Sequence, residues 1–191
     1  AVSHVLSLLL AVSGDIHPNP GPSNDRKDLS ICHVNVRSLG AVGRMESVQC
    51  DLADNYDIIA ATETWLLPSD DSSKFHLRGF HPPFRKDRNF GSLGYGGALL
   101  WVSNNIICKR RPDLEVDGIE SMWVEIRTFN TKLLLCVIYR ANSNTNSDFW
   151  NQLQDNYNMI LSQNPGKIMI IGDLNADPTT QQGKHLENFA E

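Results

Sequence analysis

Apolar positions follow two different periods along the chain, and the periods alternate from residue 29 onward. Short runs of apolar and β-branched residues predict strands over 29–36, 57–62, 98–102, 106–109, 121–127, 132–139 and 167–172. Apolar residues at helical spacing predict helices over 44–55, 147–161 and 182–190. Residues 68–89 show neither period and are expected to form a loop. The pattern therefore predicts a mixed α/β domain over residues 28–191, with a hairpin formed by the strands 121–127 and 132–139.

The first 27 residues differ from the rest of the chain. Residues 1–12 are small and apolar, and a proline-rich stretch follows them. Proline excludes a helix interior or a central strand there. We therefore expect residues 1–27 to form a leader or linker outside the domain.

Residues 14–22 (GDIHPNPGP) resemble a 2A-type ribosome-skipping peptide, whose pattern is D-[VI]-E-x-N-P-G-P after an apolar helix. The departure is His17, which stands where that family has Glu. The resemblance implies that no peptide bond forms between Gly21 and Pro22, so that the mature product begins at Pro22. A proline-rich linker without this activity is the alternative.

Composition and charge narrow the class of protein. Hydrophobic residues make up 41% of the 191 residues and the formal net charge is −5, which is typical of a globular chain. No apolar run approaches the roughly 18 residues of a membrane-spanning helix, so we expect no membrane partner. The four cysteines lie far apart in the sequence and are expected to be reduced thiols in the nucleus or cytoplasm.

Positive charge is concentrated in one part of this acidic chain. Residues 74–111 contain eight Lys or Arg and a single Asp, a net charge of +7. A basic segment on an acidic body suits a protein that meets a polyanion on one face. A solvated basic loop is the alternative.

Polar side chains end three of the predicted strands. Asn35 and Arg37 end the first, Glu63 follows the second, and Asp173 and Asn175 follow the strand 167–172. Ligand sites in open α/β sheets gather at the carboxyl ends of strands. A partly buried carboxylate is a natural partner for a hard divalent cation, and Mg²⁺ typically takes one or two of them. Each residue alone could also be a turn or helix-cap residue, but three such strand ends together favour a site.

Five phrases of the sequence carry a resemblance to a known family. They are HVNVRSL, ATETWL, GYGGALLWV, YRAN and IIGDLNAD. Their order resembles the endonuclease/exonuclease/phosphatase superfamily of Mg²⁺-dependent phosphodiesterases over about residues 29–190. Within it, NVRSL, ESMWVEI and IIGDLN look like the apurinic-type endonuclease domain of LINE-type (non-LTR) retrotransposons. The implied fold is a four-layer α/β sandwich of two mixed sheets flanked by helices.

The resemblance implies a role for each residue of the strand-end cluster. Glu63 would hold Mg²⁺, with Mn²⁺ as a substitute, against the phosphate. Asn35 and Asn175 would donate hydrogen bonds to the phosphate or orient its neighbours, and Asp173 would align or deprotonate the attacking water. Tyr139 would place its hydroxyl near the scissile phosphate, although an aromatic residue that ends a strand more commonly serves packing.

The same resemblance implies a DNA partner. Arg37 and Asn142 would contact the DNA backbone, and Lys86 and Arg88 would add phosphate contacts. A downstream reverse transcriptase domain in the full-length polyprotein would use the nick to prime synthesis.

Two departures from the family pattern matter. Arg37 stands where the family usually has an Asp that helps to bind the metal, so metal binding would depend more on Glu63. The chain also ends at Glu191, before the family's late Asp and its terminal S-D-H motif, and His185 does not match that motif. We therefore expect a domain that is incomplete at its C-terminus, with an unpaired edge strand, and a fragment that is inactive without the S-D-H motif. The alternatives are a catalytically inactive relic, a nucleic-acid-binding domain, and another superfamily phosphodiesterase, such as a deadenylase or an inositol-phosphate or sphingomyelin phosphodiesterase.

Overall fold

The computed structural model of the chain describes the backbone of residues 6–10 and, in full, residues 29–88, 95–127, 132–141, 148–177 and 179–190. Within these residues the strands form two mixed sheets. The four-stranded sheet has the order β2-β3-β5-β4, with β2 at Ile31–Asn35, β3 at Ile58–Thr62, β4 at Phe84–Lys86 and β5 at Ala98–Val102. The five-stranded sheet has the order β1-β9-β8-β7-β6, with β1 at Leu6–Leu10, β6 at Ile107–Arg110, β7 at Glu120–Arg127, β8 at Lys132–Tyr139 and β9 at Lys167–Asp173.

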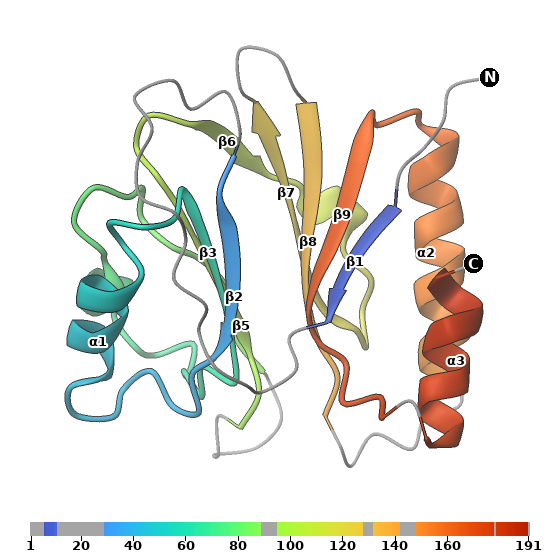
Figure 1. Cartoon of the computed structure of the whole chain (residues 1–191), viewed down its shortest axis with the longest axis horizontal. Helices are drawn as coiled ribbons and strands as arrows, with labels where there is room; N and C mark the ends of the chain where they lie inside the picture. The colour runs from blue at the N-terminus through green and yellow to red at the C-terminus, as the bar shows by residue number, and fades with distance from the viewer. Residues whose placement is uncertain are drawn as a thin grey trace.

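The two sheets pack face to face and helices cover their outer faces, so the predicted four-layer sandwich is confirmed (Figure 1). Helix α1 (Arg44–Asp51) lies on the four-stranded sheet, and α2 (Asp148–Ser162) and α3 (Gln181–Ala190) lie on the other. On β3, Ile58 and Ala60 face the space between the sheets, whereas Ile59 and Ala61 face the α1 side. Because both faces of such a strand are buried, its sequence is continuously apolar rather than alternating.

The elements predicted from the sequence are present, with small changes at their ends. The hairpin is confirmed because β7 and β8 pair antiparallel over their whole length. The helix predicted over 44–55 ends earlier, at Asp51, where Leu52 is its C-cap. The expectation of a loop throughout 68–89 is wrong in two places, because Ser72–Phe75 is a 3-10 helix and Phe84–Lys86 is β4.

The apolar leader contributes a strand, although the sequence placed it outside the fold. Leu6–Leu10 pairs in parallel with β9, from Leu6 opposite Ile168 to Leu10 opposite Gly172. In Figure 1 this strand lies at the outer side of β9. One edge of β9 is therefore paired with backbone from the same chain.

Several sequence predictions fall on residues that lie outside the described ones. They are the skipping site at Gly21 and Pro22, the turn of the β7–β8 hairpin, and Asn142. These stay predictions, as does the division of the chain at residue 28. Among the described helices, none combines the length and apolarity that a bilayer crossing requires.

Candidate active site

Two pairs of parallel strands bring the predicted strand-end residues together. Strands β2 and β3 are parallel, as are β8 and β9, so each pair delivers its carboxyl ends to one edge of its sheet. Asn35 ends β2, Glu63 follows β3, and Asp173 ends β9. The side-chain amide Nδ2 of Asn35 donates to Glu63 Oε1 at 2.8 Å and to Asp173 Oδ2 at 3.0 Å. One amide therefore bridges carboxylates that belong to different sheets.

Tyr139 ends β8 beside this cluster, with Asp173 opposite it on β9. Burial raises the pKa of the Tyr139 hydroxyl to about 12, and the negative charges of Glu63, Asp173 and Glu120 act in the same direction. The phenol therefore stays protonated at neutral pH and can donate a hydrogen bond.

Asn175 orients its neighbours. Its backbone N–H donates to Asp173 Oδ1 at 3.0 Å, and its side-chain Nδ2 donates to the carbonyl of Arg140 at 2.7 Å. Arg140 in turn donates its own N–H to the carbonyl of Asp173 at 2.8 Å. The loop after β9 is thus tied back to the end of β8, and this fixes the Asp173 carboxylate.

The backbone is strained where the site is built. Six described residues other than glycine have positive φ, and five of them lie at these strand ends: Arg37, Ser38, Glu63, Trp65 and Asn175. Such conformations cost free energy for residues with a Cβ and cluster at functional sites. The pairing between the chains after β2 and β3 holds them, because Ser38 N–H donates to the Glu63 carbonyl at 2.9 Å.

Gly172, the glycine of the IIGDLN phrase, lies where the backbones of β8 and β9 leave no room for a side chain. Gly172 pairs with Ile138 on β8 and has a φ of 150°. A Cβ at this position would collide with the Ile138 carbonyl. Only glycine allows β9 to approach β8 so closely immediately before Asp173.

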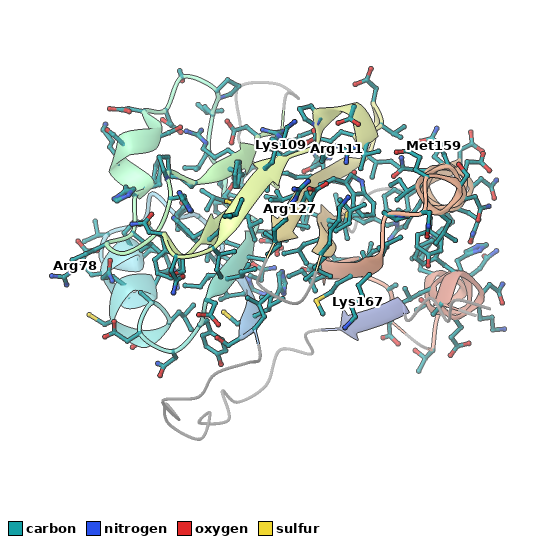
Figure 2. The ribbon with its side chains drawn as sticks, turned by 90° about the horizontal axis from the view of Figure 1, so that it is seen from above. Arg78, Lys109, Arg111, Arg127, Met159 and Lys167 are labelled. Carbon is teal, nitrogen blue, oxygen red and sulfur yellow. The ribbon has the colours of Figure 1, made fainter. Side chains whose placement is uncertain are left out.

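The basic side chains of residues 74–111 are largely matched by acids. Five of them form ion pairs: Arg85 with Asp87, Lys86 and Arg110 with Glu115, Arg88 with Glu120, and Arg111 with Asp113. Figure 2 shows Arg78 near the α1 end of the molecule, whereas Lys109 and Arg111 lie over the strands in the middle. The positive charge counted along the sequence is therefore dispersed and partly neutralised in three dimensions, which is a poorer polyanion surface than the sequence suggested.

The proposed DNA-contacting residues are not equivalent. Arg37 is exposed in the loop after β2, and its backbone N–H donates to Asn35 Oδ1 at 3.2 Å. Lys86 donates to Glu115 Oε2 at 2.9 Å, and Arg88 Nε lies 3.0 Å from Glu120 Oε1. Arg37 is thus next to the cluster, whereas Lys86 and Arg88 are already engaged by carboxylates.

Sequence reasoning missed Glu120. It begins β7 and lies opposite Tyr139 in the antiparallel pair β7–β8. A carboxylate at the start of an antiparallel strand reaches the same edge as the carboxyl end of its neighbour. The hairpin was predicted, so this register was the available signal.

The donor set at the strand ends suits a hard cation in part. Glu63 and Asp173 supply two half-buried carboxylates around Asn35, and Mg²⁺ sites typically use one or two carboxylates together with water and substrate oxygens. Within the described residues, no group of three or more His, Cys, Asp or Glu is arranged to hold a metal ion. The residues therefore fit a cation whose coordination shell is completed by oxygens of substrate and water, rather than one that is coordinated by protein ligands alone.

Solved structures share this fold. The endonuclease domain of TRAS1, a telomere-specific non-LTR retrotransposon, aligns with a TM-score of 0.59 at 16% identity, over 85% of this chain and 69% of its own. The AP endonuclease LMAP from Leishmania major aligns with a TM-score of 0.61 at 18% identity, over 78% of this chain and 55% of its own. The 3′ phosphatase NExo from Neisseria, solved with a product DNA hairpin, gives a TM-score of 0.57 at 18% identity, over 85% of this chain and 71% of its own. This chain thus spans between about half and three quarters of the length of these structures.

Sequence comparison gives the family directly. No curated protein sequence matches the chain. The family model described as "Endonuclease/Exonuclease/phosphatase family" matches residues 32–190, which run from the second residue of β2 to the end of α3 and include every residue of the strand-end cluster. The chain therefore belongs to the endonuclease/exonuclease/phosphatase family, whose members are nucleases and phosphodiesterases.

Proposed function

We propose that this domain is a Mg²⁺-dependent phosphodiesterase that nicks DNA. The observation that carries the proposal is the Asn35 amide, which bridges Glu63 and Asp173 across the two sheets. Two carboxylates held beside one neutral amide, with a tyrosine hydroxyl at the next strand end, form a set that can bind a cation and handle a proton.

Each residue has a part that follows from its position. Glu63 and Asp173 are the residues that would hold Mg²⁺, which when bound offsets negative charge that develops on the phosphate. Asp173 is also the acceptor that aligns the attacking water, because Asn175 N–H fixes one of its oxygens. Asn35 keeps the two carboxylates in register, and Tyr139 donates its hydroxyl hydrogen to the phosphate.

We propose DNA as the substrate and a non-LTR retrotransposon as the source of the domain. The NVRSL, ESMWVEI and IIGDLN phrases support this assignment, and a retrotransposon endonuclease is among the structures that share the fold. The nick would prime a downstream reverse transcriptase. Arg37, which is exposed beside the cluster, is the best-placed phosphate contact in the described part of the chain.

Nicking of supercoiled plasmid by the 191-residue chain, with and without Mg²⁺, tests the proposal. The proposal requires Mg²⁺-dependent relaxation that is lost in Glu63→Ala and in Asp173→Ala, in contrast to the inactive fragment expected from the sequence alone. Asp177→Ala is the matched control, because Asp177 follows the same strand but is exposed, and its side chain accepts hydrogen bonds from Thr179 within its own turn. Relaxation that survives both cluster variants would contradict the assignment of the site.

A non-catalytic nucleic-acid-binding domain is the second candidate. It is favoured by the small donor set at the strand ends, because the described residues hold no group of three or more His, Cys, Asp or Glu that could bind a metal ion. It predicts that the wild-type chain binds plasmid without nicking it, and that Glu63→Ala leaves this binding unchanged. Plasmid binding and nicking measured on the same preparations separate the two candidates.

A further inference from the structure

Glu120 makes three contacts at the edge of the site. Its Oε1 pairs with Arg88 Nε at 3.0 Å, and its Oε2 accepts the backbone N–H of Gly97 at 3.0 Å. In the β7–β8 pair its Cα lies opposite that of Tyr139. The side chain is 17% exposed, so these contacts are shielded from water and stronger than surface contacts.

Glu120 and two of its neighbours, Arg88 and Tyr139, converge on Gly96. A Cβ built on Gly96 would lie 2.8 Å from Glu120 Oε2, 3.0 Å from Arg88 Cδ and 3.2 Å from Tyr139 Cε1. Gly96 has a φ of 100°, and its carbonyl accepts the N–H of Trp65 at 3.0 Å, two residues after Glu63. The Gly96–Gly97 turn is therefore packed between the Tyr139 ring on one side and the segment after β3, which contains Glu63, on the other.

We infer that Glu120 is a positioning residue, which holds the Gly96–Gly97 turn and Arg88 against Tyr139, and that Arg88 acts on the site through Glu120 rather than as a phosphate contact. The inference rests on the proposed function for its effect on cleavage, but the contacts themselves do not. Burial raises the pKa of Glu120, whereas the Gly97 N–H and the Arg88 charge oppose that rise. The ion pair and the hydrogen bond thus favour the charged form of this half-buried carboxylate.

The first test is steady-state nicking by Glu120→Gln, Arg88→Gln and the double variant. Because Glu120→Gln keeps the shape of the side chain but removes the ion pair, we expect kcat to fall about tenfold with KM changed by less than about twofold. Arg88→Gln should give the same pattern, and the double variant should be no worse than the single ones, because both remove one interaction. Asp113→Asn is the matched control, since it removes the exposed ion pair with Arg111 and should leave both constants unchanged.

A rise in KM and a weaker salt dependence for Arg88→Gln at unchanged kcat would overturn the inference, because that pattern identifies a phosphate contact. Additive losses in the double variant would overturn it as well.

The second test needs no activity. The amide proton of Gly97 and the ring signals of Tyr139 are followed by NMR in the free protein. Glu120→Gln should move both, whereas Asp113→Asn should move neither. Unchanged signals in Glu120→Gln would overturn the inference even if the wild type nicks DNA. Conversely, signals that shift in Glu120→Gln, together with a wild type that fails to nick, would uphold the contacts and reject the proposed function alone.

Discussion

Asn35 donates both hydrogens of one amide to carboxylates that repel each other. Without that amide, Glu63 and Asp173 lose their shared donor and the link between the two sheets. We expect Asn35→Ala to reduce nicking about a hundredfold, since small displacements of reacting groups have effects of that size. Stability should fall by about 1.5–3 kcal/mol, the range for a hydrogen bond to a charged group. Plasmid relaxation and urea unfolding measure the two effects, and Asn151→Ala on the exposed face of α2 is the control.

The half-buried imidazole of His33 makes the stability of the fold depend on pH. Its Nε2 lies 2.9 Å from Thr62 Oγ1, and burial lowers its pKa to about 4, although the charge of Asp173 acts in the opposite direction. A histidine whose folded pKa lies below its unfolded value loses native stability as the pH falls from about 6.5 to about 4, because the unfolded chain binds the proton first.

We therefore expect the wild type to lose about 1–2 kcal/mol more than His33→Gln over that pH range, somewhat less than the full shift because part of the ring is accessible. Urea unfolding at a series of pH values measures the difference, with His185→Gln as the control on α3. Parallel pH profiles for wild type and His33→Gln would contradict the prediction.

At the residue scale, the sequence indicates which side chains lie together where a strand end alone decides the position. Asn35, Glu63 and Asp173 each follow an apolar strand, so their convergence could be expected from the sequence. Glu120 precedes its strand, and its role depends on the register with Tyr139 and on a turn from the other sheet. Likewise, the pairing of Lys86 with Glu115 joins residues 29 positions apart, which a count of charges cannot anticipate.

At the level of elements, burial on both faces made the central strands easy to predict. Strand β4 has only three half-buried residues and lacks a periodic pattern, so the loop prediction there failed. Strand β1 was missed for a different reason. A parallel edge strand is specified by the neighbour it pairs with, here β9, which lies more than 150 residues away in the chain.

The pairing of β1 predicts a specific effect of truncation. Removal of residues 1–10 takes away β1 and exposes the N–H and C=O groups along one edge of β9, whereas removal of residues 1–5 leaves β1 in place. We expect amide exchange within Lys167–Asp173 to accelerate only after the longer truncation, with more aggregation, because an open edge pairs with other chains. Equal exchange in the two truncated proteins would contradict the pairing of β1 with β9.

At the scale of the whole molecule, the site spans the boundary between two sheets, so its geometry depends on how the sheets pack. Leu99 and Leu100 are adjacent on β5 and both are fully buried, but Leu99 faces the α1 side and Leu100 faces the opposite sheet. Replacing either leucine by alanine should cost about 2–5 kcal/mol, the range for a large-to-small change in a core.

Each replacement leaves a cavity, but only the cavity at Leu100 lies between the two sheets that carry the site residues. Leu100→Ala loosens the packing that sets the distance from Asn35 and Glu63 to Asp173, whereas Leu99→Ala changes the packing beneath α1. We therefore expect Leu100→Ala to lower kcat well below that of Leu99→Ala when both are measured at a temperature where both remain folded. The two variants share strand, residue type and burial, so a difference in stability cannot produce this result if their unfolding free energies match. Equal kcat values would mean that the strand ends hold the site by their local hydrogen bonds alone, independently of the core between the sheets.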